Sequence, residues 1–236
     1  MEITAIDLYD DGIGKVEYVD HMGTDITVVN AARVSFGKHK EILDAKDKKL
    51  IKYLIKHKHT STMEHNSVTF RIKVPLFIRS QHHRHRTWSY NECSRRYTEE
   101  NLEFYAPKTF RTQSKSNRQA SNLDNIDPIM GYFEDGGANY ASAVIRSHHR
   151  WSVSLYNELM EKGVCREQAR GILPQNLYTE YYGTVNMGNL LKFIELRTHD
   201  GAQWEIQQVA HACLSIAEEL WPITIAAYRE IRGLKV

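Results

Sequence analysis

The chain has 236 residues, of which 42% are hydrophobic and 25% charged, and its formal net charge is +2. This length allows one well-buried core, and so small a net charge argues against bulk binding to nucleic acid. No apolar run approaches the roughly 18 residues that a membrane-spanning helix needs, and the acidic start of the chain lacks a signal-peptide pattern. The 3 cysteines are widely spaced, which predicts no disulfide framework. We therefore expect a cytoplasmic protein, of a host or of an infected cell, that binds neither membranes nor nucleic acid.

The first third of the chain predicts two strands, a helix and a further strand. Residues 3–8 and 15–20 read as short strands on either side of a turn at 10–12. Apolar residues within 40–57 are spaced to suit a helix with one apolar face. Residues 67–75 alternate between polar and apolar side chains before a closing proline, which predicts a strand.

The rest of the chain predicts mainly helices and one irregular segment. A short helix is expected at 76–81, and a longer one at 140–161. The segment 112–138 is rich in Ser, Asn, Asp and Gly, so we expect a loop or surface excursion there. Residues 203–220 place their apolar side chains on one face, which predicts a helix limited by Pro222.

These elements indicate an α+β fold in one domain. The sequence shows no internal repeat and no linker, so residues 1–236 are expected to form a single mixed α/β domain. We expect an antiparallel-rich sheet flanked by long helices. A GxGxxG dinucleotide fingerprint is absent, which argues against a Rossmann motif.

Residues 84–97 (RHRTWSYNECSRRY) combine several arginines with Ser, Asn, Glu and aromatic side chains. Arginine presents a planar, permanently charged fork that suits phosphate oxygens, and the neutral polar groups supply directed hydrogen bonds. This mixture favours a phosphorylated small molecule with a polar ring, such as a nucleotide. By composition alone, a solvated basic loop is an equally good interpretation. A non-catalytic nucleotide- or RNA-binding protein is the functional alternative, because single-stranded nucleic-acid sites also interleave aromatic and basic residues.

Several histidines lie between His57 and His85, which raises the hypothesis of a metal-dependent hydrolase. However, neither an HExxH motif nor a Cys/His finger spacing is present. Structural or cofactor-binding roles are therefore favoured, and no metal is expected.

The arginine-rich segment carries a more specific pattern. Arg84-His85-Arg86, seven further residues and then Ser94 reproduce the RHR-x7-S signature of the flavin-dependent thymidylate synthases. The chain resembles this family in further segments, in the same order and over nearly its whole length except about 112–140. These segments are 31–35 (AARVS), 57–65 (HKHTSTMEH), 166–178 (REQARGILPQNLY) and 184–207 (TVNMGNLLKFIELRTHDGAQWEIQ).

The resemblance implies an activity and an assembly. Family members methylate dUMP to dTMP, taking the carbon from methylenetetrahydrofolate and the hydride from FAD that NADPH has reduced. They form a homotetramer in which each active site is shared between subunits. We accordingly expect dUMP as the substrate, FAD as the cofactor, and NADPH and methylenetetrahydrofolate as co-substrates.

The resemblance also assigns roles to single residues. Arg197 is expected to favour ionisation of the uracil N3, because a fixed cation stabilises negative charge developing on the ring. Without the resemblance, Arg197 is better interpreted as a cation at a helix end. Ser94 is expected to hydrogen-bond the nucleotide near the reacting ring. A covalent role for Ser94 is the weaker option, since the sequence shows no adjacent base. The expected flavin-binding residues are His59, Ser61, Glu64, Arg84, His85, Arg86, Glu92 and Asn186, and the expected dUMP-binding residues are Gln81, Arg84, Glu92, Ser94, Arg95, Arg96, Arg170 and Arg197.

Some positions depart from the family pattern. Gly188 stands where many members carry an arginine, Lys192 where many carry an asparagine, and Gly201 in place of a histidine found in some members. We expect these differences to alter the contacts with flavin rather than the class of reaction.

Overall fold

The computed structural model describes residues 5–94, 102–118 and 120–233. By contacts between residues, the chain divides into two compact units. The first unit comprises Met1–Lys73, Gln81–Asn91 and Tyr181–Val236, and the second comprises Val74–Ser80 and Glu92–Glu180. The expectation of one domain over residues 1–236 stays a prediction.

A 5-stranded sheet with the order β1-β2-β3-β9-β4 is the main sheet of the described residues. β1 pairs antiparallel with β2, and β2 pairs antiparallel with β3. In β3, Val68, Phe70 and Ile72 are buried and alternate with less buried polar neighbours, which confirms the predicted strand. The strands are Ile6–Asp7 (β1), Lys15–Met22 (β2), Ser67–Pro75 (β3), Ser89–Glu92 (β4) and Tyr178–Asn186 (β9).

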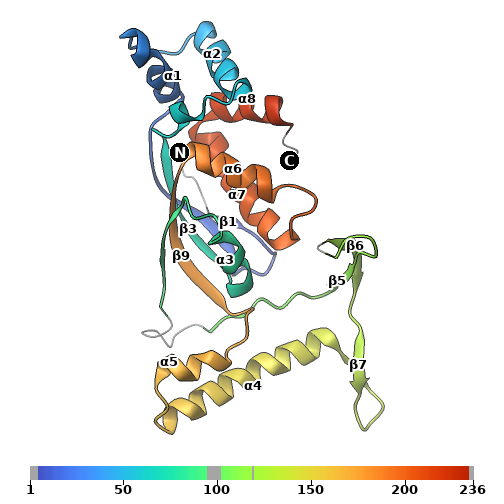
Figure 1. Ribbon diagram of the computed structural model, residues 1–236. Helices are drawn as coiled ribbons and strands as arrows, with labels where there is room; N and C mark the ends of the chain where they lie inside the picture. Colours follow the sequence, from blue (N-terminus) through green and yellow to red (C-terminus); the bar gives the residue numbers. More distant parts are fainter. Residues whose placement is uncertain (1–4, 95–101, 119, 234–236) are drawn as a thin grey trace. The chain divides into compact units, whose positions relative to one another are not determined.

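Helices of the first unit pack against one another in pairs (Figure 1): α2 lies on α8, and α6 lies on α7. The predicted helix at 203–220 is confirmed, and its buried face includes Ile206, Val209 and Cys213. Pro222 begins the next helix as well as limiting this one, because its fixed φ and missing N–H suit the first helical turn. These helices are Asp25–Arg33 (α1), Ala45–Lys56 (α2), Met187–Arg197 (α6), Trp204–Leu220 (α7) and Pro222–Arg232 (α8), with single 3₁₀ turns at Val34–Phe36 (η1) and Thr60–Met63 (η2).

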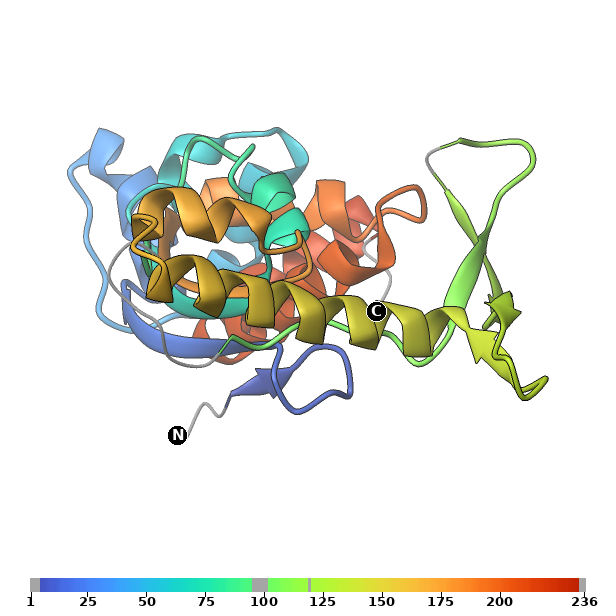
Figure 2. The same cartoon turned by 90° about the horizontal axis from the view of Figure 1, so that it is seen from below.

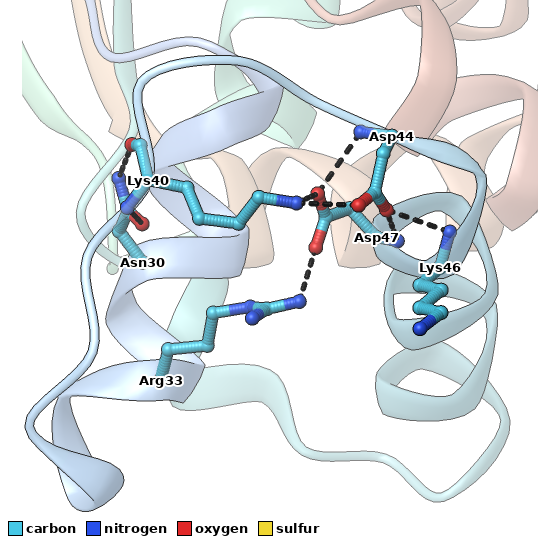
Figure 3. Close-up of polar contacts among 6 residues, drawn as sticks. All are labelled: Asn30, Arg33, Lys40, Asp44, Lys46 and Asp47. Carbon is cyan, nitrogen blue, oxygen red and sulfur yellow. Dashed lines mark hydrogen bonds and ion pairs between the residues drawn. The ribbon is translucent and has the colours of Figure 1, made fainter.

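The helix predicted over 40–57 begins later than expected, at Ala45, because Asp44 caps it by accepting from the backbone N–H groups of the first turn. Ahead of it, the backbone of Lys40 is tied to the Asn30 amide by hydrogen bonds of 2.8 and 2.9 Å. The ammonium of Lys40 lies 2.5 Å from the fully buried carboxylate of Asp47, which also pairs with Arg33 (Figure 3). This network fixes the segment between η1 and α2.

The second unit is built on two helices and two hairpins. Figure 2 shows α5 beside α4, and between them a small core holds Tyr156, Ala169 and Leu173. The prediction of a loop at 112–138 was wrong about the backbone conformation. This stretch contributes to two hairpins, one of β5 with β6 and one of β7 with β8. Their strands are mostly polar or exposed, so no alternating pattern marked them in the sequence. The elements are Phe110–Gln113 (β5), Ser121–Ile126 (β6), Ile129–Tyr132 (β7), Ala138–Tyr140 (β8), Ala141–Glu161 (α4), Arg166–Ala169 (α5) and the 3₁₀ turn Arg170–Ile172 (η3).

Among the described residues, no helix is both long enough and apolar enough to cross a membrane. The short helix predicted at 76–81 is confirmed as Leu76–His82 (α3), which links β3 to the arginine-rich segment. Of the two strands expected near the start, 15–20 is confirmed, whereas within the described part of 3–8 only Ile6–Asp7 is strand.

Candidate active site

A polar pocket of about 580 Å³ lies within the second unit. Its walls come from α3, the end of β4, the α5–η3 turn and β9. The pocket gathers three of the residues expected to bind dUMP, Glu92, Ser94 and Arg170. Arg79, Glu167, Gln175 and Thr179 are further polar residues of its lining. Arg95 and Arg96, also expected here, lie outside the described residues.

Glu92 is held by two partners on one carboxylate oxygen. The hydroxyl of Thr179 donates to Oε1 over 2.7 Å, and Nε of Arg79 lies 3.2 Å from the same oxygen. The second oxygen, Oε2, makes no hydrogen bond or ion pair with a described residue. A carboxylate fixed through one oxygen presents the other as an acceptor for a ligand hydroxyl or N–H.

Arg79 is a site residue that sequence reasoning missed. It lines the same pocket as Arg170, so the pocket offers two guanidinium groups beside the carboxylates of Glu92 and Glu167. Paired guanidinium groups suit the oxygens of a phosphate. The sequence signal for Arg79 is a basic residue two positions before Gln81, inside the short helix predicted at 76–81, and that signal is weak by itself.

Arg197, His85 and Gln81 meet in the first unit. Arg197 stands in the last turn of α6, and its Nε–H donates to Nε2 of His85 over 3.1 Å. Its Nη2 also contacts the backbone oxygen of Gln81, at 3.4 Å. The side chain of Gln81 in turn donates to that of Gln203 over 2.5 Å. The structure therefore brings together the expected base-activating arginine and two of the other predicted site residues.

The pKa values in this cluster follow from burial. Burial, and then the charge of Arg197, lower the pKa of His85 to about 4. Burial also lowers the pKa of Arg197. His85 is therefore neutral at neutral pH, whereas a guanidinium stays charged there.

Aromatic side chains support the turn that carries these residues. His82 is fully buried, and its Nδ1 lies 2.8 Å from the hydroxyl of Tyr181. The hydroxyl of Tyr90 donates to the backbone oxygen of His82 over 2.9 Å. Burial lowers the pKa of His82 well below its usual value, so it acts here as a neutral core residue. This packing anchors the turn from which Arg84 and Arg86 project.

Arg84 and Arg86 are exposed, while His85 between them is half-buried. Neither guanidinium has a hydrogen bond or ion pair with a described residue, so both are available to a ligand. The other residues expected to bind flavin, His59, Ser61 and Glu64, are also exposed, on and beside η2. Asn186 is engaged locally, because its side chain accepts from the backbone N–H of Asn189 at the start of α6.

A second, smaller pocket of about 180 Å³ adjoins η2 and α6 within the first unit. Leu54, Met63 and Leu191 line its apolar part, and Lys58 and Lys192 add positive charge. Gly188 also lines it; a Cβ there would lie 3.7 Å from the backbone oxygen of Thr60, an ordinary contact. The missing side chain at 188 therefore leaves this pocket open rather than relieving a clash.

No group of three or more His, Cys, Asp and Glu side chains among the described residues is arranged to hold a metal ion. The absence of a metal from the function stays a prediction.

Together, these observations define a mixed α/β protein whose sequence has no Rossmann motif and whose polar pocket combines arginine, glutamate and serine side chains. Residues 17–223 match the model of the family described as "Thymidylate synthase complementing protein". The chain belongs to this family. The membership predicted from the arginine-rich segment is thus confirmed.

Proteins that are similar to this chain over most of its length belong to the same family. The flavin-dependent thymidylate synthase of Thermus thermophilus is 42% identical over 217 residues, which cover 92% of this chain and 76% of that protein. The flavin-dependent thymidylate synthase of Thermosipho africanus is 41% identical over 215 residues, which cover 91% of this chain and 90% of that one. By family, the chain is therefore an enzyme of the flavin-dependent thymidylate synthase class.

Solved structures agree with the fold. A UMP/dUMP methylase, PolB, from Streptomyces cacaoi bound with 5-Br dUMP has a TM-score of 0.79 and 32% sequence identity, with 98% of this chain and 100% of that chain covered. The same methylase bound with 5-Br UMP has a TM-score of 0.75. The predicted α+β class is confirmed.

Proposed function

We propose that the chain methylates dUMP to dTMP, with methylenetetrahydrofolate as the carbon donor and FAD, reduced by NADPH, as the source of hydride. The observation that carries this proposal is the pocket that unites Glu92, Ser94 and Arg170 in a chain of this family. Family members named for flavin and thymidylate, and a methylase bound with a brominated dUMP, support the same conclusion.

The pocket of the second unit supplies the groups that a nucleotide monophosphate requires. Arg170 and Arg79 would bind the phosphate, since both guanidinium groups line the pocket. Glu92 would accept a hydrogen bond from the sugar or the base through Oε2. Ser94 would hydrogen-bond the nucleotide close to the reacting ring, and a covalent role for it stays the weaker option.

Arg197 would act on the pyrimidine ring. Methylation at C5 requires electron density at that carbon, and loss of the N3 proton raises this density. A permanently charged, half-buried guanidinium stabilises the resulting anion more strongly than an exposed one, because water screens it less. The neutral state of His85 beside it leaves this cation unopposed by a second positive charge.

Flavin binding would fall to the exposed groups of the first unit. Arg84 and Arg86 offer unengaged guanidinium groups for the diphosphate, and Ser61 and Glu64 offer polar contacts on and beside η2. When bound, the flavin supplies the hydride that completes the methyl group. Lys192, exposed beside Gly188 in the smaller pocket, would provide positive charge near position 188, at which many family members carry an arginine.

We also propose a homotetramer with shared active sites. Val34 and Phe36 of η1 are 71% and 78% exposed, and Ile42, on the following segment that the Asp47 network fixes, is 80% exposed. Large apolar side chains on a rigid exposed segment are typical of an interface. A cytoplasmic location stays part of the proposal.

Flavin content and nucleotide binding test this function together. Purified protein should show the absorbance of bound FAD, and dUMP should raise its Tm, because a ligand that binds only the native state stabilises it. The non-catalytic alternative expects no flavin, and RNA binding that weakens steeply with salt. Colourless protein that cannot be reconstituted with FAD and whose Tm is insensitive to dUMP would contradict the proposal.

A further inference from the structure

We propose that His85 is a positioning residue for Arg197, and that its neutral ring, protonated at Nδ1, accepts the Nε–H of Arg197 and fixes the orientation of the guanidinium. This inference rests on the proposed function, which gives Arg197 its task. It assigns to His85 a role that contact with flavin does not require.

The hydrogen bond itself determines the tautomer. Nε of Arg197 lies 3.1 Å from Nε2 of His85. A guanidinium has only donors, so the nitrogen of His85 must be the acceptor. A histidine ring with a lone pair on Nε2 is neutral and carries its proton on Nδ1. An imidazolium or the opposite tautomer would place two N–H groups against each other.

Two contacts then fix the plane of the guanidinium. Nε donates to His85, and Nη2 approaches the backbone oxygen of Gln81 at 3.4 Å. Both contacts use the same edge of the group, because Nε and one terminal nitrogen lie side by side on it. The N–H groups on Nη1 remain for a ligand. A donor held in a fixed direction loses less conformational entropy when it binds the transition state.

The surroundings of His85 keep its ring neutral. Arg197 faces the His85 ring from α6, and so does Phe193, whose ring is T-shaped to that of His85 with the two centroids 4.9 Å apart. From α3, the neutral ring of His82 lies 6.2 Å away, and from β4 the hydroxyl of Tyr90 donates to the backbone oxygen of His85. Among the described residues, no carboxylate contacts the ring to favour its charged form. Burial and the charge of Arg197 therefore lower the pKa of His85 to about 4.

Two amide substitutions at His85 distinguish a role in positioning Arg197 from a role in filling space. In His85→Gln, the side-chain oxygen can reach roughly the place of Nε2, whereas in the shorter His85→Asn it cannot. We expect kcat per bound flavin to stay within about threefold of wild type for His85→Gln and to fall about 10- to 100-fold for His85→Asn. Flavin absorbance, measured for each variant, separates this effect from any loss of cofactor.

A double-mutant cycle asks whether His85 acts through Arg197. In an Arg197→Lys background, His85→Asn should cost no more than about a further twofold in kcat per bound flavin, because the orientation that His85 provides is already lost. Losses that multiply would overturn the proposal and would assign His85 an independent task.

Histidine-selective ¹⁵N NMR of the full-length, ligand-free protein measures the tautomer of His85 independently of enzyme activity. At neutral pH we expect the ¹⁵N signals of a histidine whose Nδ1 is protonated and whose Nε2 is not. These signals should disappear in His85→Gln. An Nε2-protonated or charged His85 would overturn the inference. If this tautomer is found but dUMP is not turned over, the proposed function has failed while the hydrogen bond stands.

Discussion

Thr179 and Glu92, on the neighbouring strands β9 and β4, are joined by a hydrogen bond in which the Thr179 hydroxyl donates to Oε1 over 2.7 Å. Arg79 reaches the same oxygen at 3.2 Å. The carboxylate is therefore oriented from one side, and its other oxygen has no described partner. A site residue is thus prepared for its ligand by a buried threonine that does not need to touch the ligand itself.

Removing that hydroxyl should weaken substrate binding. Thr179→Val keeps the volume but removes the donor, so Glu92 should lose its fixed orientation. We expect KM for dUMP to rise about 3- to 10-fold, because the lost hydrogen bond acts on the ligand only through the orientation of Glu92, with kcat within about twofold. Steady-state kinetics measure this. Thr179→Ser, which keeps the hydroxyl, is the control, and an equal rise of KM in both variants would contradict the explanation.

Arg170 should contribute charge-assisted hydrogen bonds to the phosphate of dUMP. Arg170→Ala should weaken dUMP binding about 10- to 100-fold, and the remaining affinity should depend less on salt. Isothermal titration calorimetry at two salt concentrations tests this. Arg150→Ala removes an exposed arginine of α4 whose described hydrogen bond is local, to Ser147, and should leave binding unchanged. Equal effects in the two variants would remove Arg170 from the site.

The buried carboxylate of Asp47 should be important for stability. Lys40 and Arg33 both pair with it, so Asp47→Asn removes the anion that pairs with the partly buried Arg33 and one of the two that pair with Lys40. We expect the free energy of unfolding to fall by about 3–5 kcal/mol in urea denaturation. Glu41→Gln, an exposed substitution in the same segment, should change it by less than about 0.5 kcal/mol. A loss below about 1 kcal/mol for Asp47→Asn would show that the network contributes little.

Stability should fall as the pH drops from about 6.5 toward about 4. Burial, followed by the charge of Arg197, lowers the pKa of folded His85 to about 4, so in this range the unfolded chain binds more protons than the folded one. More protons on the unfolded chain mean that acid favours unfolding. The buried His82, whose pKa is also lowered, acts in the same direction. Urea denaturation at several pH values measures the slope, which should be shallower in His85→Gln, and an unchanged slope would contradict the shift.

Gly12 and Gly23 both have a positive φ, but only at Gly23 would a Cβ be crowded, so alanine variants of the two distinguish backbone strain from side-chain crowding. A Cβ at Gly23 would lie 2.9 Å from the side chain of Asn66, which is buried and donates to the backbone oxygen of Thr24. A Cβ at Gly12 meets nothing within 4 Å. Both alanine variants bear the cost of a positive φ, so Gly23→Ala should be about 1–3 kcal/mol less stable than Gly12→Ala. Equal losses would mean that Asn66 moves aside without cost.

The parts of the fold that the sequence predicted are those with a regular apolar pattern. The alternation in 67–75 and the apolar face of 203–220 each reflect burial on one side, which the structure confirms. The hairpins within 112–138 lack such a face, because their strands are mostly polar or exposed, so the sequence predicts a loop in their place. Pro222 marked the end of one helix, but its place at the start of α8 was not predicted.

In the candidate site, too, the sequence predicted the residues that lie in a local pattern and missed the contacts between distant residues. A local motif identified Arg84, His85 and Ser94, because those residues lie in one short segment. The pairing of His85 with Arg197 joins residues 112 positions apart, and no local pattern can predict a contact of that kind. Arg79 was missed for a similar reason: its importance comes from Glu92, which reaches it only through the packing of the sheet.

Tritium release from 5-tritiated dUMP tests the central claim most directly. Flavin-loaded protein should release tritium and form dTMP when methylenetetrahydrofolate and NADPH are both present. dTMP formation should stop when either is omitted or when FAD is removed, and Arg197→Ala should lose most of the activity. Flavin-loaded protein that binds dUMP but forms no dTMP in the complete mixture would contradict the proposed function, and near-normal turnover by Arg197→Ala would contradict the role given to that residue.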